Sequence, residues 1–290
     1  MINFWVSKTS FYQYNSFYVE SCACCDHSCR GRDFVVVAAA RGGGCSAAGA
    51  GHGYHGGADE GAGGGGLRAG SIDGGDRKAS SLAGSWPRFR NSNFDNISTE
   101  TIALNTDWPA GGPPVLWKLE LGEGHAGAAV LAGRVYILDY DREKEQDVLR
   151  CLSLDDGAEI WNYAYPVKIK RNHGMSRTVP AVTEKYLVTL GPKCHVHCLD
   201  PVTGQFYWMI DLVKEYQTVV PPWYAGQCPL IDGERVVLAP GGSALLIAVD
   251  GASGKVIWQS PNPGKWDMTH SSIIPMTFNN KKMYVYCGRG

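Results

Sequence analysis

Short runs of apolar residues, each ended by polar and turn-forming residues, fill the chain from about residue 115 onward. Residues 133–139 read Gly-Arg-Val-Tyr-Ile-Leu-Asp, and residues 185–190 read Lys-Tyr-Leu-Val-Thr-Leu. The runs are rich in β-branched and aromatic residues, which fit the pleated surface of a sheet. Their lengths and the turn residues between them predict an all-β fold of short antiparallel strands.

Three of these runs belong to eleven-residue segments that align without a gap, at residues 151–161, 198–208 and 248–258. Each segment has a glycine in its middle and ends on a tryptophan. The glycines lie 47 and then 50 residues apart, a period typical of solenoids, propellers and arrays. A period near the length of one four-stranded blade favours a β-propeller. The repeated residues are Gly157, Gly204 and Gly254, with Trp161, Trp208 and Trp258.

Each repeated segment has the features of a hairpin. Glycine supplies the positive φ that a tight connection between strands needs. Asp200 and Asp250 stand four residues before this glycine, where a carboxylate can accept hydrogen bonds from turn amides. An indole covers a large apolar face with few rotatable bonds. We therefore expect the three tryptophans to occupy equivalent buried places between blades.

Further strand-like runs complete each blade. Ahead of the third hairpin come Pro229–Ile231, the turn at Asp232-Gly233, and Arg235–Ala239. Four short strands with turns between them make one antiparallel blade. The predicted blades cover residues 126–163, 177–211 and 226–260, and the next blade begins within residues 270–290.

Both ends of this array are incomplete. Val115–Leu119 resembles the last strand of a blade, and residues 270–290 resemble the first two strands of another. We expect an open arc of about three and a half blades, the N-terminal half of a ring that normally holds roughly four to eight.

The pattern Asp-x-x-Thr-Gly-x-x-x-Trp, present at Asp200–Trp208 and with serine for threonine at Asp250–Trp258, resembles the repeat of quinoprotein-like propellers. These are the proteins grouped under pyrroloquinoline quinone (PQQ) repeats. They include PQQ-dependent alcohol dehydrogenases and the non-catalytic lipoprotein B of the outer-membrane β-barrel assembly machine. The resemblance covers residues 86–290, starting with the lead-in at 86–98. The first blade departs from the pattern at Ser153 and Asp156, so we expect a differently bonded turn there.

Residues 1–85 have a different composition. Seventeen of the 45 residues from Gly31 to Gly75 are glycine. Such a stretch buries too little apolar surface to offset the entropy of ordering it. We expect a disordered leader, either natural or an artefact of translating upstream DNA. This leader has no clear signal peptide, and no segment of the chain approaches the roughly 18 apolar residues of a membrane span.

Charge adds little to the choice of partner. The net charge is −1 and 19% of the residues are charged. The chain has no basic stripe for nucleic acid and no acidic tail.

Two cysteine clusters invite a metal interpretation. The cluster at residues 22–29 lacks a second ligand pair in a foldable module, and glycine surrounds its further candidates, Cys45 and His52. In Cys194-His195-Val-His197-Cys198, strand alternation places the histidines on one face and the cysteines on the other. We predict core packing there and no metal site.

The resemblance implies where a cofactor would lie. PQQ enzymes hold the quinone on the ring axis beside calcium, and many carry a disulfide between adjacent cysteines. The only adjacent pair here, Cys24-Cys25, lies outside the predicted propeller. No catalytic residue is assigned, and we expect no cofactor in this chain.

The segments that lead into each first strand should surround one mouth of the central channel, where propellers bind ligands or partners. The alternative is that these polar residues only solvate the rim. The residues singled out are His125, His173, Arg177, Trp223 and His270.

Two functions therefore stand open. The first is a non-catalytic scaffold for protein interaction or envelope assembly, which the resemblance places in the periplasm. The alternative is a fragment of a PQQ-dependent alcohol or sugar dehydrogenase that binds PQQ with calcium in the full-length protein. The repeat supports both, because fold does not imply function.

Overall fold

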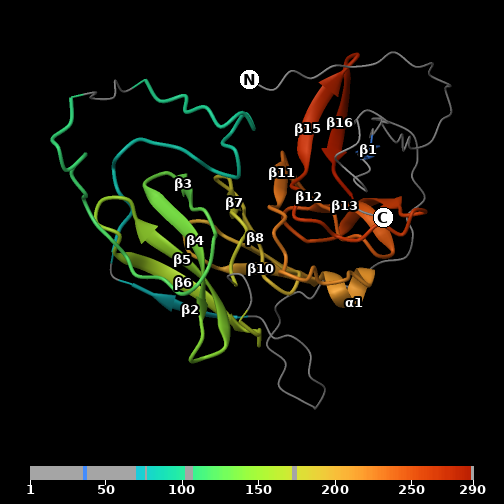
Figure 1. Ribbon diagram of the computed structural model, residues 1–290, viewed down its shortest axis with the longest axis horizontal. Helices are drawn as coiled ribbons and strands as arrows, with labels where there is room; N and C mark the ends of the chain where they lie inside the picture. Colours follow the sequence, from blue (N-terminus) through green and yellow to red (C-terminus); the bar gives the residue numbers. More distant parts are fainter. Residues whose placement is uncertain (1–34, 38–69, 76, 102–106, 172–174, 289–290) are drawn as a thin grey trace.

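The computed structural model is almost entirely β-structure, arranged as successive antiparallel sheets (Figure 1). The residues that it describes are 35–37, 70–75, 77–101, 107–171 and 175–288.

The first sheet is built from four strands that follow one another along the chain, with a fifth strand added at its outer edge. Their order is β2-β6-β5-β4-β3. The strands are β2 (Ser71–Gly74), β3 (Ala129–Leu131), β4 (Arg134–Asp141), β5 (Gln146–Ser153) and β6 (Glu159–Pro166).

The second and third sheets each contain four strands in chain order, β7 to β10 and β11 to β14. The second sheet comprises β7 (Ala181–Val182), β8 (Leu187–Leu190), β9 (His195–Leu199) and β10 (Phe206–Asp211). The third comprises β11 (Leu230–Asp232), β12 (Arg235–Leu238), β13 (Ala244–Asp250) and β14 (Val256–Pro261).

A short helix and a last sheet complete the described chain. Helix α1 (Leu212–Tyr216) follows β10, and the Asp211 side chain caps it by accepting from the Lys214 amide. The last sheet pairs β15 (Ile274–Phe278) with β16 (Lys281–Tyr286), and β1 (Val35–Val37) pairs with β16.

The predicted all-β propeller of four-stranded antiparallel blades is confirmed. Within the described ranges, no strand of the first sheet pairs with a strand of the last sheet. The sheets therefore form an open arc, as expected.

The repeated turns have the geometry that their residues require. Gly157, Gly204 and Gly254 have φ values of 69°, 74° and 68°. Asp200 Oδ1 accepts hydrogen bonds from the Val202 and Thr203 amides at 2.9 and 2.7 Å. In the first blade Ser153 takes the place of Asp200 and its Oγ accepts from the Asp155 amide at 3.4 Å, while the Asp156 carboxylate accepts from the Ala158 amide at 3.0 Å, so this turn is bonded differently.

Each tryptophan of the first two blades lies against the turn of the next sheet. The Trp161 indole N–H donates to the Val202 carbonyl at 3.0 Å, and its ring covers Gly204. The Trp208 indole N–H donates to the Gly251 carbonyl at 2.8 Å. A side chain on these turn glycines would collide with the indoles, so the turn needs glycine for space as well as for φ.

Trp258 differs from the other two. It is only half-buried and stacks on Tyr284 at a centroid distance of 6.0 Å. The reason is that the last sheet provides no equivalent turn among the described residues.

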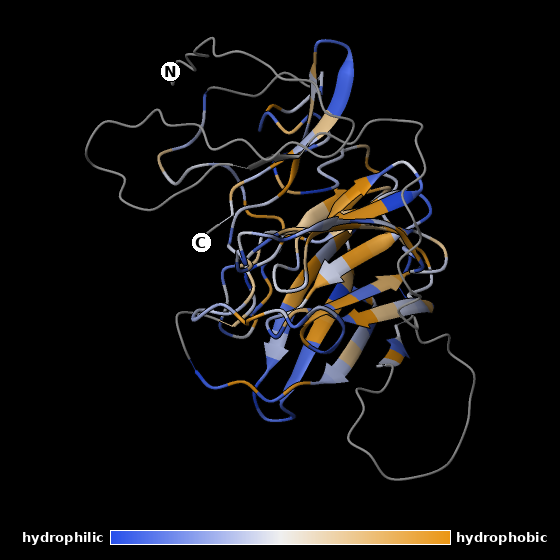
Figure 2. Ribbon diagram, turned by 90° about the vertical axis from the view of Figure 1, so that its right-hand side faces the viewer, coloured by the Kyte–Doolittle hydropathy of each residue, from blue (hydrophilic) through white to orange (hydrophobic). Residues whose placement is uncertain are grey.

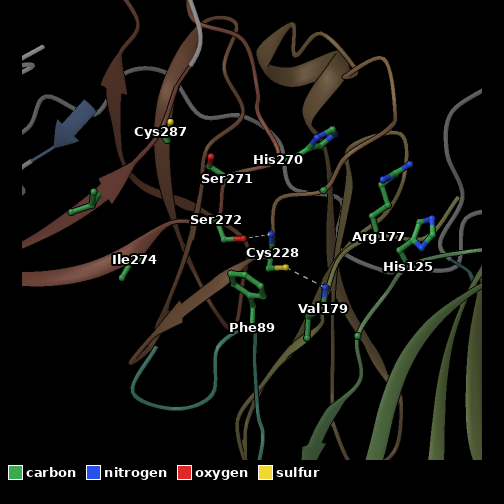
Figure 3. Close-up of a pocket in the computed structure, with 13 residues that line it drawn as sticks. Phe89, His125, Arg177, Val179, Cys228, His270, Ser271, Ser272, Ile274 and Cys287 are labelled. Atoms are coloured by element: carbon green, nitrogen blue, oxygen red, sulfur yellow. Dashed lines mark hydrogen bonds between the residues drawn. The ribbon is translucent and has the colours of Figure 1, made fainter. Parts of the chain in front are cut away.

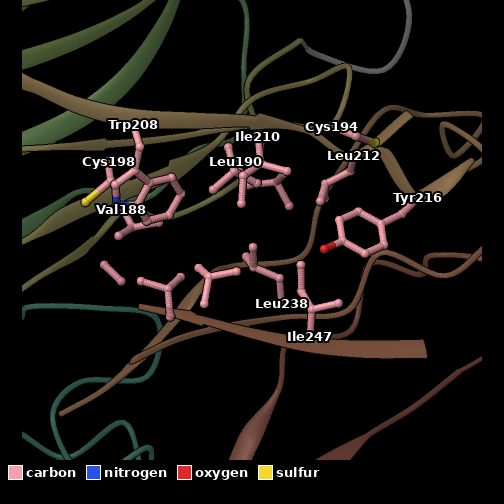
Figure 4. Close-up of a cluster of buried hydrophobic side chains, with 14 of the residues drawn as sticks. Val188, Leu190, Cys194, Cys198, Trp208, Ile210, Leu212, Tyr216, Leu238 and Ile247 are labelled. Atoms are coloured by element: carbon pink, nitrogen blue, oxygen red, sulfur yellow. The ribbon is translucent and has the colours of Figure 1, made fainter. Parts of the chain in front are cut away.

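Many residues of the strands are hydrophobic, as the orange segments of Figure 2 show. Three apolar interfaces hold the sheets together, and Figure 4 shows the one between the second and third sheets. We call them the first, second and third interface, in chain order of the sheets that they join. The second interface is formed by residues such as Val188, Leu190, Trp208, Leu238 and Ile247. Burying large apolar side chains in this way is the main source of stability.

Two local expectations need correction. Val115–Leu119 is not a strand but an exposed connection, although the Trp117 indole lies on Gly157 and donates to the Leu154 carbonyl at 3.1 Å. Regular structure also begins before residue 86, because β2 pairs with β6. An edge strand offers unpaired backbone groups to any neighbouring segment, whatever the composition of that segment. The rest of the expected leader, apart from β1, lies mostly outside the described residues.

Candidate functional site

A pocket of about 650 Å³ opens where the first strands of the sheets begin (Figure 3). The segments that lead into the first strands of all four sheets contribute residues to it, which is the arrangement expected for the mouth of a propeller channel. Hydrogen bonds join its walls: the Val179 amide donates to Cys228 Sγ at 3.2 Å, and the Cys228 amide donates to Ser272 Oγ at 3.0 Å. Its lining comprises Phe89, His125, Gly127, Arg177, Val179, Gly226, Cys228, His270, Ser271, Ser272, Ile274, Val285 and Cys287.

Two imidazoles and one guanidinium line this pocket. The His125 amide donates to the Ser176 carbonyl at 2.6 Å, which brings His125 beside Arg177 from the next sheet. His270 comes from the segment before β15, and its ring lies against Gly226. A methyl group at Gly226 would approach the His270 ring to 2.6 Å, so this glycine makes room for the histidine. Figure 3 shows the three side chains on the same side of the pocket.

An aromatic side chain stands at the rim. Trp223 is 51% exposed and stacks on His270, with ring centroids 6.3 Å apart. It belongs to a tight turn in which the Tyr224 amide donates to the Pro221 carbonyl at 2.8 Å. The Tyr224 hydroxyl donates to the Lys170 carbonyl at 2.6 Å, and the Tyr224 carbonyl lies 2.8 Å from His270 Nε2. Tyr224 has φ of 64°, an uncommon conformation that these contacts hold in place.

The lead-in segment Trp86–Phe89, which we call the strap, contributes Phe89 to the lining of the pocket. Trp86 pairs with Val130 of β3, and the Val182 amide of β7 donates to the Pro87 carbonyl at 2.8 Å. Arg88 Nη1 donates to the Ile231 carbonyl of β11 at 2.9 Å. The strap therefore satisfies backbone groups on the inner edges of three sheets and places Phe89 in the pocket.

Burial of the strap has an electrostatic effect. It lowers the pKa of Arg88, and the nearby charge of Asp232 partly opposes this shift. The guanidinium also stacks over the Phe94 ring at 5.4 Å.

Four of the five residues predicted at the mouth lie in the described chain. The structure brings His125, Arg177 and His270 together as lining residues and places Trp223 against His270. His173 lies outside the described residues.

Sequence reasoning missed two parts of the site. The strap is an irregular segment in the sequence. Its aromatic and basic residues show no periodicity, so no sequence pattern predicts that it lies beside the pocket. Tyr224 follows the Pro-Pro-Trp sequence, which does indicate a turn, but its contact with Lys170 depends on the tertiary fold.

Among the described residues that line the pocket there is no Asp or Glu. Glu123, close to the mouth, forms ion pairs with Arg171 and Arg142 at 2.8 and 4.0 Å. Asp267 is exposed and is not part of the lining. Among the described residues, no three His, Cys, Asp or Glu side chains are placed to hold a metal ion together.

A second group of ionisable residues is buried in the first interface. The Tyr165 hydroxyl donates to Asp147 Oδ2 at 2.8 Å, and the His197 ring packs on the Tyr165 ring with centroids 4.2 Å apart. Burial raises the pKa of Asp147 to about 7. It lowers the pKa of His197 to about 3, with the neighbouring His195 as a further cause.

The histidines and cysteines of β9 and its preceding turn face opposite interfaces. His195 and His197 contact the tyrosines of the first sheet. Cys194 and Cys198 lie in the second interface, where burial raises the pKa of Cys194 to about 12. Cys24 and Cys25, and the cysteine cluster at residues 22–29, lie outside the described residues.

A protein-family model described as outer membrane protein assembly factor BamB matches residues 144–290. No curated protein sequence matches the chain. The described part of the chain contains no helix with the length and apolar character that a membrane crossing requires.

Several solved structures are similar to the chain at low identity. BamB from Moraxella catarrhalis is 14% identical with a TM-score of 0.42, and the alignment covers 77% of this chain and 58% of that one. Quinohemoprotein alcohol dehydrogenase from Comamonas testosteroni is 18% identical with a TM-score of 0.43, over 60% of this chain and 27% of that one. The corresponding ADHIIG enzyme from Pseudomonas putida HK5 is 22% identical with a TM-score of 0.38, over 51% and 22%. The chain thus spans less than two thirds of the length of each of these proteins.

Proposed function

This chain belongs to the PQQ-repeat propeller family whose model is described as outer membrane protein assembly factor BamB, and we propose that it is a non-catalytic scaffold that binds a partner protein. The family description favours a role in assembly of the cell envelope, in the periplasm. The partner binds at the channel mouth.

The observation that carries this proposal is the arrangement of Trp223 beside the pocket. Tryptophan and arginine are the residue types most enriched where interfaces gain their binding energy. Trp223 is half exposed, and the hydrogen bonds of Tyr224 hold its turn in place. A preformed anchor loses little entropy when a partner covers it. Arg177 lines the pocket next to this anchor.

The alternative, a PQQ-dependent dehydrogenase, fits the pocket less well. Calcium takes oxygen ligands, with carboxylates prominent among them. The described part of the lining holds two serines but no Asp or Glu, and the Phe89 ring is one of its walls. We therefore propose that this chain binds no PQQ with calcium.

Adding PQQ and calcium to the purified chain tests that alternative. We expect no saturable change in quinone absorbance and no dye reduction with simple alcohols. Saturable binding with turnover would establish the dehydrogenase instead.

Site-specific photo-crosslinking in the native host tests the scaffold proposal. A photoreactive amino acid replaces Trp223 in one variant and Val202 in the other. Val202 is a matched control, because it is 50% exposed but lies in the β9–β10 turn away from the pocket. We expect a discrete cross-linked envelope protein from position 223 and none from position 202. Equal products from both positions, or none from 223, would overturn the proposal.

A further inference from the structure

We propose that the outer edge of β6 is a second site for a partner protein, which adds an extended segment there as a further strand. In the free chain β2 occupies this edge and competes with the partner. The segment that fits has glycine at both ends and an aromatic side chain between them. This edge is separate from the pocket, because β3, whose lead-in segment lines the pocket, lies at the opposite end of the same sheet.

Strand β2 is an addition to its blade and not one of the four repeated strands. In the described part of the chain the second and third sheets contain four strands each, whereas β2 lies as a fifth strand outside β6. It comes from before the strap and pairs antiparallel with β6, with Ser71 opposite Ala164 and Gly74 opposite Trp161. An edge strand offers backbone N–H and C=O groups to any extended segment. The first sheet therefore has an outer edge that accepts a strand from outside the blade.

Backbone pairing supplies most of the attraction between β2 and β6. All four residues of β2 are exposed, and Ile72 is 41% exposed although it stands opposite Tyr163. Tyr163 stacks on Phe206, which is only partly buried, so this face of the edge still has apolar surface to cover. Directly opposite side chains in an antiparallel pair lie on one face and contact each other. An aromatic residue in the place of Ile72 therefore binds this edge more tightly than β2 does.

The two ends of β2 decide which residue type the edge accepts. The Gly70 amide donates to the Tyr163 hydroxyl at 2.8 Å, and a methyl group on Gly70 would lie 2.3 Å from the Ala164 carbonyl oxygen and 2.7 Å from Tyr163 Cζ. A methyl group on Gly75 would lie 2.3 Å from the Glu159 carbonyl oxygen. The carbonyl oxygens of a paired strand cannot turn aside without breaking the sheet. Both end positions therefore require glycine, which lets the backbone approach this closely.

The attachment of β2 to the rest of the chain makes it a competitor. Ser80 fixes the connection that follows β2, because its amide donates to the Gly133 carbonyl at 3.0 Å and its hydroxyl donates to the Asp155 carboxylate. A strand on a short tether competes at an effective concentration of roughly millimolar order. Segments that only form backbone bonds are thereby kept off the edge, and a partner needs the additional aromatic contact. This is the selectivity that β-strand addition gains from side chains.

Two neighbouring glycines of the full chain provide a matched test. Gly75→Ala places a methyl group against the β6 backbone and should release β2, whereas Gly74 has no atom within 4 Å of an added carbon, so Gly74→Ala should retain it. The probe is the amidated peptide Gly-Ser-Phe-Thr-Val-Gly, with fluorescein attached through an aminohexanoyl spacer. Fluorescence anisotropy should show that Gly75→Ala binds it about tenfold or more tightly than Gly74→Ala and the natural chain, because the tethered competitor is gone. Equal binding by the two variants, or none by Gly75→Ala, would overturn the inference.

The peptide and its place on the chain are tested with the same variant. A peptide with alanine at both ends should bind Gly75→Ala about tenfold more weakly than the glycine peptide, since its methyl groups collide with β6. Hydrogen exchange followed by mass spectrometry should show that the glycine peptide protects the amides of residues 159–166. Equal binding of the two peptides, or protection elsewhere only, would refute the edge site. Far-UV circular dichroism and the thermal midpoint verify that each variant retains its blades.

Photo-crosslinking in the native host distinguishes a partner protein from a second copy of this chain. A photoreactive amino acid replaces Asn162, which lies on β6 opposite Asp73. The product should be a different protein, in higher yield with Gly75→Ala than with Gly74→Ala. Equal yields, or cross-links only to the chain itself, would contradict the partner site. Loss of cross-linking from position 223 alone would overturn the proposed mouth site and leave the edge site standing.

Discussion

The first and second interfaces occupy equivalent places in the repeat, yet their chemistry is opposite. Aligned on the repeated turns, Asp147 and Tyr165 of the first blade correspond to Cys194 and Leu212 of the second. The first interface consequently contains a buried carboxyl, tyrosines and two histidines. At the corresponding positions, the second is aliphatic and sulfur-containing (Figure 4).

The comparison shows that the same blade backbone can hold polar or apolar side chains at equivalent positions of the interface. Asp147 Oδ1 and both ring nitrogens of His197 are buried without a hydrogen-bond partner among the described residues. Unpaired buried polar groups cost stability, whereas buried aliphatic groups add to it. The second interface should therefore supply pH-independent stability, and the first should make stability depend on pH.

The largest expected effect is on the second interface. Trp208→Ala removes a fully buried indole and its hydrogen bond to Gly251. It should lower the free energy of unfolding by about 3–5 kcal/mol, the cost of large aromatic truncations in cores. Urea denaturation measures the change. An unchanged midpoint would show that the repeat tryptophan does not hold the sheets together.

The first interface should respond to removal of its carboxyl charge. The pKa of Asp147 is raised from 3.8 to about 7, so its contribution to stability is present below pH 3.8 and is lost as pH rises through 7. Asp147→Asn accepts the same hydrogen bond from Tyr165 without a charge. It should be more stable than the natural chain by up to about 4 kcal/mol at pH 8, and by almost nothing at pH 3.

Urea denaturation at the two pH values measures this difference. Cys194→Ala, at the corresponding position of the second interface, serves as the control and should change stability equally at both. If Asp147→Asn changed stability equally at both pH values, the pH dependence could not come from ionisation of the Asp147 carboxyl.

His197 should give the opposite pH dependence. Its pKa is lowered from 6.5 to about 3, so the stability that it contributes is present above pH 6.5 and is lost as pH falls toward 3. His197→Phe keeps the ring against Tyr165 but cannot be protonated. Between pH 7 and pH 5 its stability should fall by about 2 kcal/mol less than that of the natural chain. Parallel curves for the two proteins would contradict this expectation.

The smallest effect is expected at the end of the arc. Trp258→Ala removes a half-buried indole that packs at the edge of the third interface and stacks on Tyr284. The loss should be about 1 kcal/mol, since partial burial stabilises less than full burial. The difference between the losses in free energy of unfolding for Trp208→Ala and Trp258→Ala, measured under the same conditions, gives the contribution of packing against the turn of the next sheet. A loss as large as that of Trp208 would show that something covers Trp258 in solution.

The hairpins could be predicted from the sequence because their determinants are local. Gly204 and Asp200 lie within one turn, and three copies in register remove the ambiguity of any single copy. The convergence of His125, Arg177 and His270 also follows from the repeat, since equivalent loops meet at the mouth.

Other features depend on contacts that no local pattern encodes. Arg88 reaches Ile231 across 143 residues, and nothing periodic links the two. Asp147 stands at the beginning of a strand, where an aspartate is usually read as a solvated turn residue. Asp147 is buried because Tyr165 bonds to it and the second sheet packs against both residues.

The strap also sets an order of events during folding. Its bonds to β3, β7 and β11 join segments far apart in sequence, and closing such long loops is slow relative to forming each hairpin. In a chain emerging from the ribosome, the bonds of the strap to β3 and β7 can form first, and its bond to β11 follows only when the third sheet has been synthesised. Phe89 lies next to Arg88 and lines the pocket together with residues of the third and fourth sheets, so this pocket is complete only after those sheets have assembled. A partner that contacts Phe89 within the complete pocket can distinguish a finished arc from a nascent one.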